Sequence, residues 1–359
     1  MSDVFDYLTW RGDISFKDSP FNEVDNIIFC LLTYINFTDV VPEVFSSSIT
    51  IQEASKADYS LRRIPDPRLY QLLDCCGKSR RFRDVLLTGY SEVFKEDEDC
   101  QFGALTFLFQ SGSTYISFRG TDCSVTGLKE DFNMVYKAPI PSQACGVHYL
   151  TRFMKELGWW KRRHEIQLGG HSKGGNVAQY AAVHGPKTAR RHIRTIWSND
   201  GPGFNEELFP KEWITPLIPS MKTLLPSNSI IGRLFDHQEA IELITSSDSG
   251  FNAHDPFTWV ISGPGIVRAG DDAPQPVRFD RSFRDWMHHI SFEERKQIVD
   301  AIYEVICDMG IKTMFDFRDF KLSQAVSGIK ALTQLDSELK KALVHGITQF
   351  YKSYMQNQT

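Results

Sequence analysis

Ser172 is the residue in this sequence best suited to nucleophilic chemistry. It lies at the centre of Gly170-His171-Ser172-Lys173-Gly174, which fits the pattern G-x-S-x-G. A serine in this pattern occupies a strained turn between a strand and a helix, and glycines flank it because a Cβ would clash there. The turn exposes the hydroxyl and points the next amide at a developing oxyanion. The alternative interpretation is a glycine-rich turn with a structural role only.

The residues around this pentapeptide predict the strand, turn and helix that it requires. Residues 165–168 are short and partly apolar, as the end of a strand should be. Residues 176–183 have the small and apolar spacing of a buried helix, and Gly185-Pro186 would end that helix. The local context therefore favours a catalytic serine.

A serine hydroxyl needs a base to accept its proton, and the base needs an acid to orient it. His254 is the predicted base because it follows an expected strand and lies among turn-forming residues beside a proline. The alternatives are His237 as the base, or a turn-stabilising role for His254. Four further candidate histidines lie on expected helices or just before a strand: His184, His192, His288 and His289.

Asp200 is the predicted acid because it ends the expected strand after the Ser172 helix, and catalytic groups collect at the carboxyl ends of parallel strands. Asp236 is its rival, and Asp255 beside the histidine is expected only to cap a turn. The structural alternative for Asp200 itself is an Asx-turn. For the oxyanion hole we expect the amides of Thr121 and Lys173, since Gly120 lets the chain turn its amides inward. The Thr121 hydroxyl could donate there as well.

Hydrophobic patterns divide the chain into three regions. Residues 1–100 are expected to be mainly helical, with an N-cap at Ser19-Pro20, a buried helix through 26–34 that is apolar nearly all round, and short helices at 68–73 and 83–87. Residues 101–262 alternate strands (104–109, 114–118, 193–197, 222–225 and 240–244) with helices near 128–132 and 149–157. Residues 263–276 read as a linker or long loop, and helices follow at 283–309 and 332–351. The predicted class is α/β, with a mostly parallel sheet between helices and helical extensions at both ends.

Composition indicates which partners, cofactors and cellular compartment to expect. A net charge of −5 over 359 residues gives no reason to expect a nucleic-acid partner. The sequence has no H-E-x-x-H and no cysteine pairs at zinc spacing, so we expect neither metal nor cofactor. Seven cysteines without a C-x-x-C favour a reducing compartment. The N-terminus lacks a signal-peptide pattern, and the apolar run at 27–35 is too short to span a bilayer, so we expect a soluble cytoplasmic protein.

Two motifs resemble the class 3 (fungal triacylglycerol) lipases of the α/β-hydrolase superfamily. Phe118-Arg119-Gly120-Thr121 is similar to the strand end that carries their oxyanion residue, and Gly170-His171-Ser172-Lys173-Gly174-Gly175 is similar to their nucleophile motif. The elbow is more similar still to a bacterial lipase-like domain of unknown function, which reads G-H-S-K-G-G-N. The resemblance covers about residues 100–262. It implies Ser172 as nucleophile, Thr121 as oxyanion residue and His254 as base.

The resemblance leaves two points open. Class 3 lipases usually have an apolar residue where this chain has Lys173. Their acid follows a later strand, which favours the region of Asp236, whereas an acid at Asp200 resembles the pancreatic-type lipases.

The leading hypothesis is a serine hydrolase of carboxylic esters, with a small-molecule acyl ester or lipid as substrate. A thioesterase, amidase or acyltransferase would use the same triad, and a non-catalytic interaction module is the third alternative. Residues 204–225, with Trp213, Leu217 and Ile218, are expected to form either an acyl pocket or lid, or an ordinary core helix. The sequence does not predict the oligomeric state.

Overall fold

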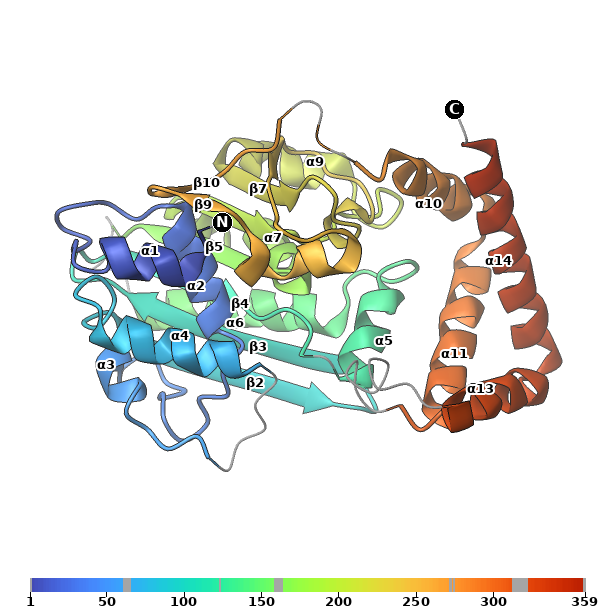
Figure 1. Cartoon of the computed structure of the whole chain (residues 1–359), viewed down its shortest axis with the longest axis horizontal. Helices are drawn as coiled ribbons and strands as arrows, with labels where there is room; N and C mark the ends of the chain where they lie inside the picture. Colours follow the sequence, from blue (N-terminus) through green and yellow to red (C-terminus); the bar gives the residue numbers. More distant parts are fainter. Residues whose placement is uncertain are drawn as a thin grey trace.

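An eight-stranded sheet forms the centre of the molecule (Figure 1). The computed structural model describes residues 2–60, 66–122, 124–157, 164–270, 273, 275–311 and 322–357. The strands lie side by side in the order of the chain: β1 (Ile49–Thr50), β2 (Leu86–Lys95), β3 (Cys100–Leu108), β4 (Thr114–Phe118), β5 (Ile166–His171), β6 (Ile193–Asn199), β7 (Met221–Pro226) and β8 (Ile241–Ile244). Strands β1 to β4 pair antiparallel, and β4 to β8 pair parallel. The predicted α/β class with a mostly parallel sheet is confirmed.

The parallel half follows from alternation of apolar strands and amphipathic helices. Helices α5 (Val125–Asn133) and α6 (Pro141–Leu157) connect β4 to β5, and α7 (Lys173–His184) with α8 (Lys187–Arg190) connects β5 to β6. Helix α9 (Lys211–Ile214) and the 3-10 helix η2 (Thr215–Ser220) precede β7. Both faces of the sheet are buried, since Tyr115 of β4 belongs to one core cluster and its neighbour Ile116 to another. This burial on both faces is typical of parallel sheets.

The N-terminal helices cover one face of the sheet. They are α1 (Val4–Arg11), α2 (Glu23–Leu32), α3 (Ile51–Ala54) and α4 (Pro67–Lys78). Residues 24–32 are all buried, so the predicted all-round apolar helix is found. Its start is not at Ser19-Pro20, because Asn22 caps it and accepts hydrogen bonds from the amides of Val24 and Asp25.

Residues 83–87 are not a helix, contrary to expectation. Strand β2 begins at Leu86 and pairs along its length with β3, with a bulge between Thr88 and Ser91. A short apolar run fits a strand or a buried helix equally well, and pairing with β3 decides between them. Helices α6 and α7 cover the opposite face, where Gly146 lets α6 approach Val177 of α7. The domain boundaries near residues 100 and 262 stay predictions.

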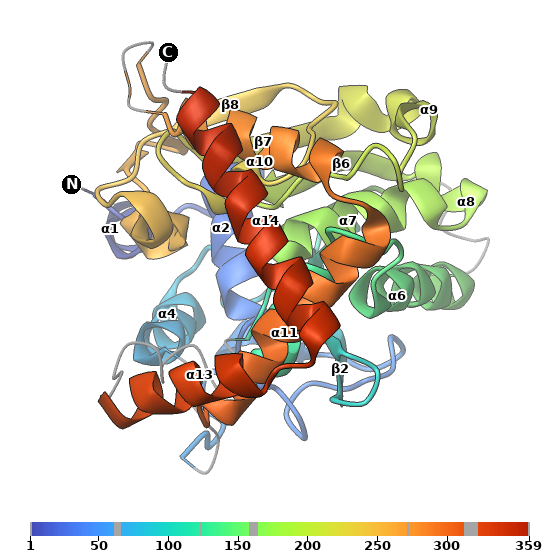
Figure 2. The same cartoon turned by 90° about the vertical axis from the view of Figure 1, so that its right-hand side faces the viewer.

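The C-terminal region forms a separate helical layer at one end of the sheet (Figures 1 and 2). It contains α10 (Val277–His289), α11 (Phe292–Asp308), α13 (Leu322–Gln334) and α14 (Ser337–Gln356). The pattern at 283–309 is two helices, because Ser291 and Glu294 form a capping box that starts α11. The pattern at 332–351 also spans a break, since Asp336 caps α14. None of the described helices is long and apolar enough to cross a bilayer.

Candidate active site

Ser172 occupies the turn between β5 and α7 with φ 58° and ψ −136°. This left-handed backbone conformation is costly for a residue with a Cβ and is tolerated where surrounding structure imposes it. A Cβ on Gly170 would lie 2.2 Å from the carbonyl carbon of Gly174. One on Gly174 would lie 2.1 Å from the carbonyl oxygen of Phe118. The two glycines therefore permit the close approach that the G-x-S-x-G pattern predicts.

Asp200 and His254 meet at the carboxyl edge of the sheet. Asp200 follows β6, and His254 ends the 3-10 helix η4 (Gly250–His254). His254 Nδ1 lies 2.6 Å from Asp200 Oδ2. The fully buried carboxylate also accepts hydrogen bonds from Ser229 Oγ at 2.6 Å and from the Gly232 amide at 3.1 Å. With Nδ1 held in this way, Nε2 is the nitrogen of the partly exposed His254 ring that can serve as a base.

His171, which precedes Ser172, connects the elbow to the His254 loop. The two rings lie with centroids 4.4 Å apart. His171 Nε2 is 2.8 Å from the His254 carbonyl oxygen, and Nδ1 is 2.9 Å from the Tyr34 hydroxyl of the N-terminal region. Burial, with a smaller effect of His254, holds the pKa of His171 well below its usual value, so the ring is neutral. A carbonyl only accepts, so Nε2 carries the proton and Nδ1 accepts from Tyr34.

Within the described part of the chain, Ser172 Oγ makes no hydrogen bond, to His254 or to any other group. The structure therefore contains a hydrogen bond between His254 and Asp200 and none between His254 and Ser172 among the described residues. Catalytic hydrogen bonds are often long before substrate binds and tighten in the complex. The structure places both residues against His171, and the transfer of a proton between them stays a prediction.

The rival residues have other partners. His237 Nδ1 lies 3.1 Å from Glu239 Oε1, and its Nε2 lies 2.6 Å from the Gly232 carbonyl oxygen. Asp236 lies 3.5 Å from Arg284 Nε. Asp255 accepts from the Phe257 amide as a cap, as expected, and also pairs with Arg68 at 2.7 Å. The structure thus brings Asp200, and neither other aspartate, into hydrogen-bonding contact with His254.

The loop after β4 lies against the elbow. A Cβ on Gly120 would lie 3.0 Å from Ser172 Cβ and 2.6 Å from the His171 carbonyl oxygen, so Gly120 allows this close approach. Thr121 follows it, and its hydroxyl donates to Asp131 Oδ2 at 2.6 Å. That proton is directed at Asp131 here, which leaves the Thr121 amide as the expected oxyanion donor.

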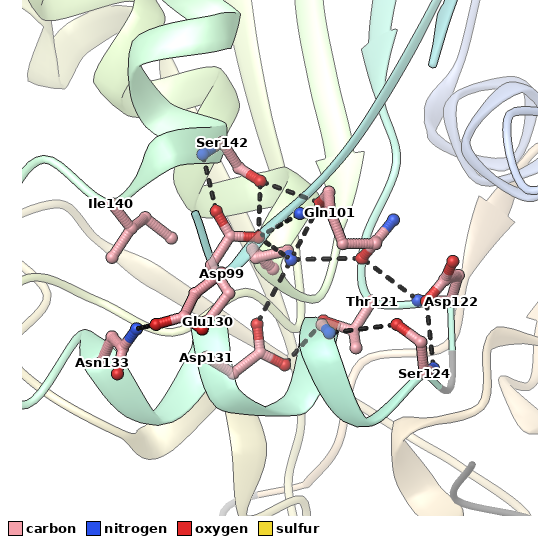
Figure 3. A network of polar contacts seen from close by, with 12 residues as sticks. Asp99, Gln101, Thr121, Asp122, Ser124, Glu130, Asp131, Asn133, Ile140 and Ser142 are labelled. Atoms are coloured by element: carbon pink, nitrogen blue, oxygen red, sulfur yellow. Dashed lines mark hydrogen bonds and ion pairs between the residues drawn. The ribbon is translucent and has the colours of Figure 1, made fainter. Parts of the chain in front are cut away.

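Lys173 is buried, and its side chain contacts a polar network whose residues on α5 and β3, Glu130, Asp131 and Gln101, are shown in Figure 3. Its Nζ lies 2.6 Å from Glu130 Oε2, 3.1 Å from the Gln101 carbonyl oxygen and 3.7 Å from Asp131 Oδ1. Burial lowers the pKa of Lys173, but the carboxylates of Glu130 and Asp131 outweigh it, so the pKa is raised. The polar residue after the nucleophile is therefore explained by an ion pair with α5. Sequence reasoning missed Glu130, although a lysine in an otherwise apolar and glycine-rich motif signalled a buried partner.

The stretch at 204–225 packs as part of the core. Ile214 and Leu217 are buried in the same cluster as α7. The Trp213 ring packs edge-on against His184 at 5.1 Å, and His184 is the last residue of α7. His184 is the twelfth and last residue of α7, so it lies about 18 Å from the elbow along the helix axis. The stretch contains α9, η2 and most of β7 rather than one core helix, and the Trp213 side chain is 45% exposed, so an acyl pocket or lid stays a prediction.

Comparison with solved structures finds lipases at low identity. A triacylglycerol lipase described as having a serine protease triad is 12% identical, with a TM-score of 0.41, over 61% of this chain and 78% of that chain. A mutant form of MDLA from Penicillium cyclopium is 13% identical, with a TM-score of 0.41, over 69% and 84%. A Rhizomucor miehei lipase propeptide complex is 13% identical, with a TM-score of 0.36, over 51% and 68%.

No curated protein matches the sequence. A family model does match, over residues 76–304, which is more than half of the chain and includes the elbow, the Asp200 and His254 loops and the Lys173 network. This chain belongs to the Mbeg1-like family.

Proposed function

We propose that this protein is a serine hydrolase that cleaves acyl esters through Ser172, His254 and Asp200. The observation that supports it most is the strained Ser172 beside a loop whose histidine is held by a fully buried carboxylate. Strain of this kind concentrates at functional sites, and a purely structural turn has no need of an oriented imidazole at its edge.

In the proposed reaction Ser172 Oγ attacks the acyl carbonyl carbon while His254 Nε2 takes the hydroxyl proton. The amides of Thr121 and Lys173 stabilise the oxyanion, and each such donor is typically worth about 3 kcal/mol in the transition state. His254 then gives its proton to the leaving alcohol as the carbon–oxygen bond breaks. Water, deprotonated by His254, attacks the acyl-enzyme and releases the acid and Ser172.

Asp200 holds the His254 tautomer and stabilises the imidazolium in this proposal. Its hydrogen bonds from Ser229 and Gly232 fix the carboxylate before substrate arrives. Lys173 supplies its amide to the site and directs its charged end away, towards Glu130. We propose a small acyl ester or acyl lipid as substrate, without a cofactor or nucleic-acid partner.

Active-site labelling tests the proposal directly. A fluorophosphonate probe should label the wild-type protein, and Ser172→Ala should abolish labelling. Ser198→Ala is the matched control, because Ser198 is a buried serine on the neighbouring strand β6, and it should label normally. Absence of labelling in the correctly folded wild type would contradict the proposal and favour a non-catalytic interaction module.

A substrate panel then separates the acyl-transfer alternatives. Esters of increasing chain length, a thioester and an amide should be compared at equal acyl group, since one triad can serve all of them. We expect the highest kcat/KM for esters. A preference for thioester or amide would keep the proposed residues and change the reaction.

We also propose a reducing compartment such as the cytoplasm. The cysteines in the described ranges, Cys30, Cys75, Cys76, Cys100, Cys145 and Cys307, are all free thiols. Cell fractionation that finds the protein only outside the cytoplasm would contradict this.

A further inference from the structure

Helix α14 exposes apolar side chains along its outer face. Val344, Ile347 and Tyr351 are exposed to 59%, 61% and 62%, and Tyr354 and Met355 are also exposed. We call these five residues the outer stripe. The opposite face of the helix is buried against α10 and α11 through Ala342, Leu343, Gly346 and Ser353.

The outer stripe is a continuous surface rather than a set of scattered residues. Ile347 lies three residues after Val344, Tyr351 lies four after Ile347, and Tyr354 and Met355 lie three and four after Tyr351. This spacing places all five on one side of the helix over about 16 Å. Figure 2 shows α14 at the outside of the C-terminal layer, in front of α10 and α11. Continuous exposed apolar surface is typical of an interaction site, whereas single exposed apolar residues are ordinary.

Positive charge surrounds the outer stripe. Lys340 and Lys341 lie before Val344, and Lys352 lies on the same flank of the helix as Lys341. Arg278 of α10 packs its guanidinium 3.6 Å from the Tyr354 ring centroid. The last acidic residue of α14 is Glu338 in its first turn. The partner should therefore be anionic.

A second copy of this chain fits these charges poorly. Antiparallel pairing of two stripes would bring Lys341 of one copy near Lys352 of the other, and parallel pairing would bring Lys340 of one copy near Lys340 of the other. Like charges at such positions disfavour pairing. Tyrosines and lysines beside aliphatic residues on one helix face are instead typical of helices that lie in the interface of an anionic membrane.

We propose that the outer stripe of α14 docks the protein on the surface of an anionic lipid bilayer. The apolar side chains enter the headgroup region while Lys340, Lys341, Lys352 and Arg278 contact lipid phosphates. This surface uses none of the residues proposed for ester hydrolysis. Docking is therefore independent of the chemistry at Ser172.

Vesicle co-sedimentation of the full-length protein tests the proposal. Vesicles of phosphatidylcholine with about 30% phosphatidylserine are compared with vesicles of phosphatidylcholine alone. We expect binding to the anionic vesicles and at least about tenfold weaker binding to the neutral ones. Lys340→Gln/Lys341→Gln/Lys352→Gln should weaken anionic binding about 100-fold, at about fivefold for each charge. These lysines lie on the surface, so this variant should fold normally.

The apolar contribution is tested with Val344→Ser/Ile347→Ser/Tyr351→Ser, which should weaken binding at least about tenfold. Val44→Ser/Phe94→Ser is the matched control, because both residues are similarly exposed and lie outside α14. It should bind like the wild type. All variants should keep the wild-type circular dichroism and the same hydrolysis of a water-soluble ester.

Three results would overturn the proposal. One is no binding to anionic vesicles, and another is binding that the two α14 variants leave unchanged. The third is a wild-type dimer, measured by light scattering, that the apolar variant converts to a monomer. That result would assign the outer stripe to a second copy of the chain.

Discussion

Removing the Lys173 ammonium should destabilise the protein more than removing any surface charge. Lys173 and Glu130 are both fully buried and lie 2.6 Å apart. In Lys173→Met the Glu130 carboxylate keeps the Ser142 amide at 2.6 Å, the Ser142 hydroxyl at 2.8 Å and the Gln101 amide at 3.1 Å. Its countercharge is gone, so three neutral donors must hold a buried anion.

The magnitude follows from burial. Breaking a buried ion pair by removing one partner typically costs about 3–5 kcal/mol, because the remaining charge has lost its hydration as well as its partner. Replacing both charges removes that penalty. The double variant Lys173→Met/Glu130→Gln should therefore cost less than the sum of its two single variants, by about 2 kcal/mol or more.

Urea unfolding followed by tryptophan fluorescence gives the free energy of unfolding for the four proteins of this cycle. Lys296→Met is the matched control, since Lys296 also lies 2.6 Å from a carboxylate, that of Asp300, but is half exposed. Its loss should cost less than about 1 kcal/mol. A cost for Lys173→Met as small as that of the control, or strict additivity in the cycle, would refute the reasoning.

Three further predictions concern the site and its surroundings. Asp200→Asn should lower kcat/KM for an acyl ester by about 10⁴-fold while Asp236→Asn stays within about threefold, and comparable losses would contradict the assignment of Asp200. Burial, opposed by Lys173, raises the pKa of Asp131 from 3.8 to about 6, so the folded state holds this proton more tightly. The free energy of unfolding should therefore decrease as the pH rises from about 4 to about 6, by at most about 1.4 kcal/mol per pH unit from this group. The urea midpoint of Asp131→Asn should change less with pH over this range than that of the wild type. Gly174→Ala should destabilise by about 2 kcal/mol or more, because its Cβ would lie 2.1 Å from the Phe118 carbonyl oxygen. The control Gly270→Ala would meet no atom of the described residues within 4 Å and should be neutral in thermal unfolding.

Local patterns predicted the elbow and the parallel strands well, because a G-x-S-x-G turn and buried apolar strands are specified by a few neighbouring residues. Residues 83–87 were assigned to the wrong class because pairing of β2 with a later strand decides their conformation. The boundary between α10 and α11 depends on a capping box that the apolar pattern does not register. The first of these errors arose from a strand partner elsewhere in the chain, and the second from a local capping box.

At the candidate site, local sequence patterns identified the candidate residues but not their distant contacts. The types and order of Ser172, Asp200 and His254 could be read from strand ends and turn residues. The partners of Lys173 and His171 could not, because Glu130 and Tyr34 lie 43 and 137 residues away along the chain. A buried polar residue signals that a partner exists, and only the fold identifies it.

The hydrogen bond from Tyr34 to His171 predicts the effect of truncating the protein at its amino terminus. Tyr34 lies just after α2, and its hydroxyl donates to His171, whose ring contacts the His254 loop. Asn26, within α2, donates to Asn199 at 2.8 Å. A shortened protein that began after residue 35 would keep every proposed catalytic group. It would lose the hydrogen bonds from Tyr34 to His171 and from Asn26 to Asn199. Proteolysis that removes α1 and α2 should therefore lower the proposed ester hydrolysis while Ser172, Asp200 and His254 all remain in the chain.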